Sequence, residues 1–198
     1  MAAPVQSELK KRANQMLGKL SPQQREELLI KCWMSHDARW FTAVAMNHGM
    51  QAANRANQAA VREEGKVEAR RLARALGLGP VQNAADFLLA QEAMIGLLGP
   101  DLLEYDAAQT GDPPEAGWRI EIKRCFAFDN VSRAGVADQY ECGILPRVQG
   151  WLEGLGLQYE MTPALGKCLK AQGQECAYAF RLNGLGGPAA PSATGTPG

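Results

Sequence analysis

The sequence predicts an α+β fold, in which a helical N-terminal half packs on a small antiparallel sheet with covering helices. Two observations predict it. Apolar residues in the first half recur at helical spacing. After residue 100, apolar and polar residues alternate within segments that are bounded by turn-forming stretches, as in strands. The expected organisation is therefore a helical region over 1–99, an α+β unit over 100–183, and a Gly- and Pro-rich tail over 184–198. The composition of the tail predicts disorder.

Local signals place the helices of the first half. Ser21 is a candidate N-cap, and Pro22 suits the first helical position. Gly49 marks a break, after which helical composition continues to a stop at Gly77. A further helix is predicted over 84–98, before the next Gly-Pro pair.

The second half reads as strands joined by turns. The stretch "TGDPPEAG" has turn chemistry and separates two candidate strands. "LQYEM" and "ECAYAFRL" are two more, and "GVADQYECGILPRVQGWLEGLG" is a helix with Pro146 at a kink or in its first turn. Within "WRIEIKRC" the alternation puts Trp118, Ile120, Ile122 and Arg124 on one face, and Glu121, Lys123 and Cys125 on the other.

Composition and charge exclude several classes of partner. Lys+Arg and Asp+Glu are 21 each, so no overall field favours nucleic acid or an anionic membrane. The stretch "MAAPVQSELKKRANQ" lacks the apolar core of a signal peptide, and no apolar run approaches the ~20 residues of a membrane span. We expect a cytoplasmic protein without membrane or nucleic-acid partners, and a homodimer stays open.

Four of the five cysteines are concentrated in the second half: Cys125, Cys142, Cys168 and Cys176. In a reducing compartment, clustered cysteines more often bind metal or do chemistry than form disulfides. Gly173 can turn the chain so that the last two come together. A structural zinc takes four ligands in a tetrahedron, and these four thiols suit it. Ordinary buried thiols are the alternative.

The C-terminal pattern "C…GW…G…C…GQEC" resembles the 4-vinyl reductase-type small-molecule-binding domain. The similarity covers about residues 100 to 182. Its marks are a cysteine before a Gly-aromatic helix and a Cys-x7-Cys pair with a glycine midway, here Cys142, Gly150, Trp151, Gly154, Cys168, Gly173 and Cys176.

This resemblance implies an antiparallel sheet covered by helices, a bound zinc and a pocket for an aromatic or tetrapyrrole-like ligand. One position departs from the pattern. The family has an acidic residue three before the middle cysteine, where this chain has Leu165. Cys125 or Glu160 would then be the fourth zinc ligand.

The stretch "CWMSHDARWFTAVAMNHGMQAANRANQAAVREEGKVEARRL" is similar to a family of uncharacterised bacterial and archaeal cytosolic proteins. These proteins are related to the L-2-amino-thiazoline-4-carboxylic acid hydrolase-like group, whose activity opens a ring at C–S and C–N bonds. The marks of the similarity are Trp33, His36, Asp37, Trp40, Asn54, Asn57 and Gly65.

Helical spacing places several of these residues on one broad face, where they could form the floor of a pocket. His36 between two tryptophans could exchange a proton with a bound ligand. Packing residues with a solvated His-Asp pair is the alternative. The predicted ligand-binding residues are Trp33, His36, Trp40, Asn54 and Asn57, although the two asparagines could instead bond a neighbouring helix.

Three functions follow. The first is a zinc-stabilised module that binds a small, partly aromatic molecule. The second is a hydrolase of a C–N or C–S bond, with Cys125 or Cys32 as nucleophile, His36 as its base and Asp37 orienting the imidazole. The third is a [4Fe–4S] protein using the four cysteines, which the absence of a Cys-x2-Cys pair disfavours.

Overall fold

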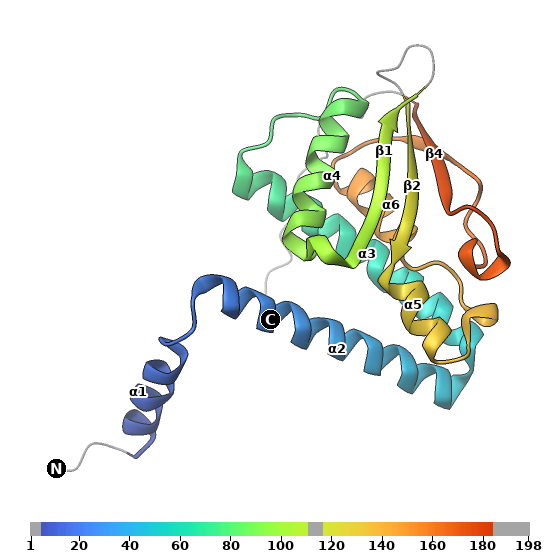
Figure 1. The fold of residues 1–198 in the computed structure, drawn as a ribbon. Helices are drawn as coiled ribbons and strands as arrows, with labels where there is room; N and C mark the ends of the chain where they lie inside the picture. Colours follow the sequence, from blue (N-terminus) through green and yellow to red (C-terminus); the bar gives the residue numbers. More distant parts are fainter. Residues whose placement is uncertain (1–4, 111–116, 184–198) are drawn as a thin grey trace, which may run out of the picture. The chain divides into compact units, whose positions relative to one another are not determined.

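The computed structural model describes residues 5–110 and 117–183 (Figure 1). The chain divides into two compact units, 1–43 and 44–198. The sequence suggested a boundary at residue 99. The structure instead groups the helix predicted after Gly49 and the helix predicted over 84–98 with the sheet. The predicted disordered tail and most of the predicted "TGDPPEAG" turn lie outside the described residues.

The first unit contains α1 (Val5–Leu17) and most of α2 (Pro22–His48). A reciprocal pair of hydrogen bonds fixes the start of α2. The amide of Gln24 donates to Ser21 Oγ at 3.1 Å, and the amide of Ser21 donates to Gln24 Oε1 at 2.9 Å. This capping box satisfies two backbone donors at the helix start. The predicted cap at Ser21 is confirmed.

The second unit begins within α2 and continues through α3 (Met50–Leu76) and α4 (Ala84–Leu98). Gly49 and Gly77 flank α3 with φ of 84° and 63°, values that favour glycine. Asn83 caps α4, because its Oδ1 accepts from the amide of Asp86 at 2.9 Å. The predicted ends of these helices are confirmed.

Four strands form one antiparallel sheet in the order β1-β2-β4-β3. The strands are β1 (Leu103–Gln109), β2 (Gly117–Cys125), β3 (Tyr159–Thr162) and β4 (Ala177–Leu182). The remaining elements are α5 (Phe126–Arg133), α6 (Ile144–Gly154) and the short 3₁₀ turns η1 (Pro100–Leu102), η3 (Ala137–Gln139) and η4 (Lys170–Gln172). The α+β fold class is confirmed, and Pro146 lies in the first turn of α6.

A β-bulge changes which residues of β2 face the core. The pairing with β1 shifts register between Glu104 and Tyr105 and leaves Lys123 without a partner. An extra residue in one strand reverses the alternation beyond it. Arg124 is therefore exposed and Cys125 is buried at 7% exposure. The faces predicted for Arg124 and Cys125 were wrong. The bulge arises from the pairing of β2 with β1, which the sequence of β2 alone does not show.

An aromatic stack forms the centre of the core on one face of the sheet. Phe87 from α4 lies 4.8 Å, centroid to centroid, from Trp118 of β2, which stacks on Phe180 of β4 at 4.9 Å. Burial of such rings is among the largest contributions a side chain makes to stability. The stack joins α4 to the two central strands.

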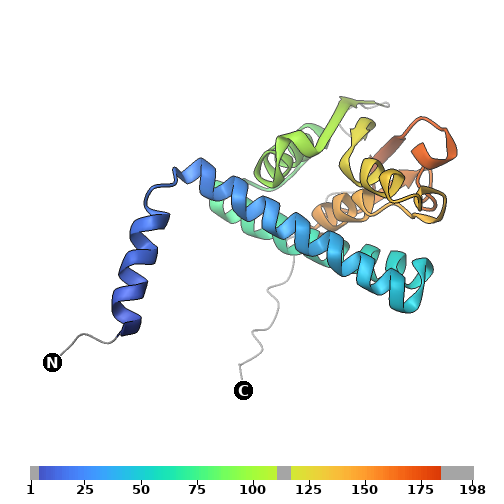
Figure 2. The same ribbon diagram turned by 60° about the horizontal axis from the view of Figure 1, so that its bottom comes forward.

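Helices α3 and α6 cross at close range through glycines, and both views show them side by side (Figures 1 and 2). A Cβ on Gly65 would lie 2.5 Å from the backbone oxygen of Arg147, and one on Gly150 would meet the backbone of Arg62. A Cβ on Gly154 would lie 2.7 Å from the backbone oxygen of Lys66. Gly65, Gly150 and Gly154, which belong to the two sequence patterns, therefore have a packing role.

Within the described part of the chain, no helix is both long enough and apolar enough to cross a membrane.

Candidate functional site

The backbone brings two of the four cysteines onto one side of a short two-stranded pairing. The amide of Cys142 donates to Gly166 O at 3.2 Å, and the amide of Cys168 donates to Tyr140 O at 3.0 Å. These bonds surround an isolated antiparallel bridge. Because successive side chains alternate across a strand, Cys142 and Cys168 lie on the same face of the pairing.

The other two cysteines reach the same region from the sheet. The amide of Ile122 donates to Cys176 O at 2.8 Å, which extends the β2–β4 ladder. Lys170 Nζ donates to Lys123 O at 2.7 Å and ties η4 to the end of β2, where Cys125 lies. Cys125 and Cys176 are therefore at the same end of the sheet as η4, which follows Cys168.

Gly173 makes the turn between the last two cysteines. Its φ of 69° is left-handed, and its amide donates to Lys170 O at 3.0 Å. The amide of Gln172 donates back to Cys168 O at 3.2 Å. The turn predicted at Gly173 is confirmed.

All four thiols are buried, each 7% or 8% exposed. Burial raises the pKa of Cys142 to about 12 and that of Cys176 to about 11, and it also raises the pKa of Cys125. Neighbouring thiols add to each shift: Cys168 acts on Cys125 and Cys176, and Cys125 acts on Cys142 and Cys176. Cys125 therefore lies within electrostatic range of each of the other three sulfurs.

Two of the sulfurs lie at helix starts and accept backbone hydrogen bonds. The sulfur of Cys125, directly before α5, accepts from the amides of Phe128 and Ala127. The sulfur of Cys142 likewise accepts from the amides of Leu145 and Ile144, in the first turn of α6. N–H groups at a helix start favour the thiolate and oppose the effect of burial on the pKa.

As they stand, the described side chains include no group of three or more Cys, His, Asp or Glu residues that could hold a metal ion. Tetrahedral zinc at ~2.3 Å from each thiolate places its sulfurs roughly 3.8 Å apart. The cysteine cluster, meaning Cys125, Cys142, Cys168 and Cys176, supplies suitable donors but would have to close around an ion.

The structure also bears on the fourth ligand. Glu160 is exposed, and its Oε1 accepts from Asn183 Nδ2 at 3.0 Å. Cys125 is buried and acts electrostatically on two of the other cysteines. Of the two predicted substitutes for the missing acidic residue, Cys125 is the one gathered with the cluster.

Amide side chains of α3 hold the segment that carries Cys142. Asn54, only 2% exposed, donates from Nδ2 to Gln139 O at 2.8 Å and accepts at Oδ1 from the amide of Glu141 at 3.3 Å. One turn later, Gln58 Nε2 donates to Cys142 O at 3.2 Å. The protein itself therefore uses the amide of Asn54, and sequence reasoning missed Gln58.

Asn57 lies against the same segment. A Cβ on Gly143 would lie 2.5 Å from Asn57 Nδ2 and 3.0 Å from the hydroxyl of Tyr140, which accepts from the amide of Gly143 at 3.1 Å. Tyr140 was also missed. The spacing of Asn54, Asn57 and Gln58 along one helical face was the available signal, but it does not say which segment they bind.

The predicted residues of α2 do not share one environment. Trp33 and Asp37 are half-buried, whereas His36 is exposed and Trp40 is 39% exposed. Cys32 is an exposed free thiol. All five belong to the first unit, and Asn54 and Asn57 belong to the second. A pocket shared by the two sets stays a prediction.

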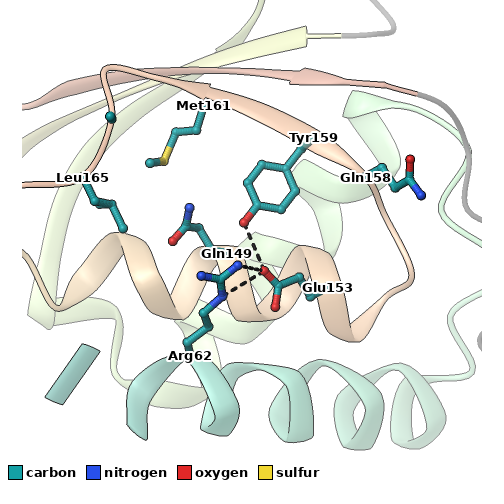
Figure 3. Close-up of a pocket in the computed structure, with 8 residues that line it drawn as sticks. Arg62, Gln149, Glu153, Gln158, Tyr159, Met161 and Leu165 are labelled. Carbon is teal, nitrogen blue, oxygen red and sulfur yellow. Dashed lines mark hydrogen bonds and ion pairs between the residues drawn. The ribbon is translucent and has the colours of Figure 1, made fainter. Parts of the chain in front are cut away.

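A cavity of about 560 Å³ opens in the second unit between α3, α6 and the segment around β3 (Figure 3). Known ligand cavities are commonly 300–1,000 Å³. Neither its size nor its position was predicted. The lining residues are Arg62, Gln149, Glu153, Gln158, Tyr159, Met161, Ala164 and Leu165.

Comparison with known protein families finds a match for part of the chain. Residues 19–91 match the model of a family of unknown function (DUF6125). The matched segment includes α2, α3 and the first half of α4, and it stops before the cysteine cluster. No curated protein and no solved structure matches the chain.

Proposed function

We propose that the second unit is a zinc-stabilised module that binds a small, partly aromatic molecule. The observation that carries the metal proposal is the gathering of four buried thiols at one end of the sheet. They are Cys125, Cys142, Cys168 and Cys176. The backbone hydrogen bonds to the sulfurs of Cys125 and Cys142 support thiolate ligands there.

In this proposal the zinc is structural. Four thiolates complete a tetrahedron and leave no position for a reactive water. The ion would join the end of β2, the start of α6 and the loop through η4. Since such a site forms only in the folded chain, its binding free energy would stabilise the fold.

The cavity beside α6 supports the ligand-binding part of the proposal. Leu165 lines it and lies three residues before Cys168. A metal that fixes Cys168 would therefore also restrain one wall of the cavity. The module would hold its binding surface in shape through the cysteine cluster.

The hydrolase alternative is less well supported. A nucleophilic cysteine needs a thiolate near neutral pH, and burial raises the pKa of Cys125. The other candidate nucleophile, Cys32, and its candidate base His36 are both exposed on α2. A [4Fe–4S] cluster would use the same four thiols and is distinguished by its iron and its colour.

Cysteine variants test the proposal. With zinc bound, Cys168→Ser and Cys176→Ser should each lower the free energy of unfolding by several kcal/mol, measured by chemical denaturation. A zinc chelator should lower the melting temperature of the parent protein but leave both variants nearly unchanged. Cys32→Ser is the matched control and should behave like the parent. Variants as stable as the parent, with the same response to chelator, would contradict the structural zinc.

A further inference from the structure

The walls of the cavity beside α6 differ in chemistry. In Figure 3, Met161 and Leu165 point into one part of it, while Arg62, Glu153 and Tyr159 meet in the other. Met161 and Leu165 are half-buried and pack against the core. A ligand that covered them would remove apolar surface from water, which favours binding.

The charges at the polar wall balance one another. Glu153 Oε1 accepts from Arg62 Nε at 2.9 Å, and Lys66 Nζ lies 3.2 Å from Oε2. Lys66 also pairs with Glu63 at 2.6 Å. A cationic ligand would have to compete with Arg62 and Lys66 for the Glu153 carboxylate. An anionic ligand would have to compete with the carboxylates for these two cations. The balance favours an uncharged ligand.

The same network fixes the orientation of the Gln149 amide. Tyr159 donates its hydroxyl hydrogen to Glu153 Oε1 at 3.3 Å, so the hydroxyl can only accept from Gln149. The side-chain amide of Gln149 lies beside this hydroxyl and acts to lower the pKa of Tyr159. Its Nε2 therefore faces Tyr159, because the flipped amide would place two oxygens together without a hydrogen between them.

This orientation leaves the amide oxygen without a donor. Gln149 Oε1 is buried, and no group in the described residues donates to it. A buried acceptor without a hydrogen bond is unfavourable, because it has lost its hydration without gaining a partner. Gln149 lies between the apolar and the polar wall (Figure 3), where a ligand could reach this oxygen from the apolar side.

We propose that this cavity binds an uncharged small molecule with an apolar, ring-sized body and one N–H or O–H donor that Gln149 Oε1 accepts. The body lies against Met161 and Leu165, and the donor points toward α6. This inference names the ligand chemistry of the proposed function and rests on its ligand-binding part. It does not require the metal.

The test compares three probes with counterparts whose donor hydrogens are replaced by methyl groups. Indole, benzyl alcohol and benzamide are titrated beside 1-methylindole, benzyl methyl ether and N,N-dimethylbenzamide. Two-dimensional NMR of the full chain follows the backbone and side-chain N–H signals and locates the site. At least one donor-bearing probe should perturb Gln149 and Tyr159 and bind about tenfold more tightly than its capped counterpart.

Variants separate the donor contact from general hydrophobic binding. Gln149→Leu should remove the preference for the donor-bearing probe, whereas Gln51→Leu, an exposed change on α3, should keep it. The inference is overturned if no probe binds, if capped and uncapped probes bind equally, or if the shifts map to Trp33 and Trp40. Zinc content of the same samples is recorded, so that loss of the metal proposal and loss of the ligand proposal are told apart.

Discussion

Helices α2 and α3 follow one another in the chain and have the same length, 27 residues, yet they are buried very differently. No described residue of α2 is fully buried, although it carries two tryptophans. Helix α3 buries Ala53, Asn54, Gly65 and Ala69. Small side chains and an amide let α3 approach α6 and the Cys142 segment closely.

The comparison teaches that conspicuous side chains are not the best guide to position in this fold. Trp33, His36 and Trp40 attracted a functional interpretation because aromatic and imidazole groups suit ligands. Glycine and alanine permit close helix packing, and Asn54 satisfies backbone groups of another segment. The structural roles fall on the less conspicuous helix.

The largest expected effect comes from a methyl group on the packed face of α3. Gly65→Ala should lower the free energy of unfolding by about 3 kcal/mol or more, because its Cβ would meet the backbone of Arg147. Urea denaturation measures it. Gly96→Ala on α4 is the matched control: nothing lies within 4 Å of its Cβ, so it should stabilise by about 0.5–1 kcal/mol. Equal effects at both sites would mean that α3 and α6 are not packed closely.

Asn54→Ala should be the next in size. It removes the partners of Gln139 O and the Glu141 amide, a loss of about 2 kcal/mol. It should also weaken zinc binding, measured by competition with a chromogenic chelator, because the Cys142 segment loses its support. Gln51→Ala, exposed on the same helix, should change neither quantity. If Asn54→Ala changed neither the free energy of unfolding nor zinc binding, the Asn54 amide would not position the Cys142 segment.

The Glu153 ion pairs predict a smaller, pH-dependent effect. Burial acts to raise the pKa of Glu153, but hydrogen bonds from Arg62 and Lys66 outweigh it and lower the pKa. A lowered carboxyl pKa stabilises the fold above the unfolded value of about 4.3, and this contribution is lost as the pH falls. Glu153→Gln should therefore cost up to about 1 kcal/mol at pH 7 and little at pH 3. The melting temperatures of the variant and the parent protein should therefore converge as the pH falls from 7 to 3. A difference in melting temperature that stays constant across this range would contradict the ion pairs.

The smallest effect is expected on α2. His36→Ala should change the free energy of unfolding by less than about 0.5 kcal/mol, since the side chain is exposed. Thermal denaturation of the variant beside the parent protein measures it. A loss of 2 kcal/mol would show that this face of α2 is packed, and the contrast between the helices would have to be withdrawn.

Local chemistry explains what the sequence could predict. Ser21, Gly49, Gly77 and Gly173 act through the backbone of their own neighbours, so the helix ends and the cysteine turn were predictable. The alternation of apolar residues likewise indicated the strands. The four cysteines could be proposed as a group because zinc needs such donors.

Tertiary pairing explains what could not be predicted. The bulge at Lys123 depends on β1 and brings Cys125 to the buried side. The short helix α5 follows directly from β2, and its sequence reads as part of the strand pattern. The partners of Asn54 and Gln58 lie more than 80 residues away, so no local signal identifies them. The cavity depends on three elements at once.

The central claim is tested most directly by the metal content of protein purified without a His tag, by elemental analysis with the visible spectrum alongside. We expect one zinc per chain, no colour, and loss of the zinc in Cys168→Ser. Iron with a brown absorbance would replace zinc with a cluster. Protein without metal, whose melting temperature does not rise when zinc is added, would contradict the account and leave the four cysteines as buried thiols.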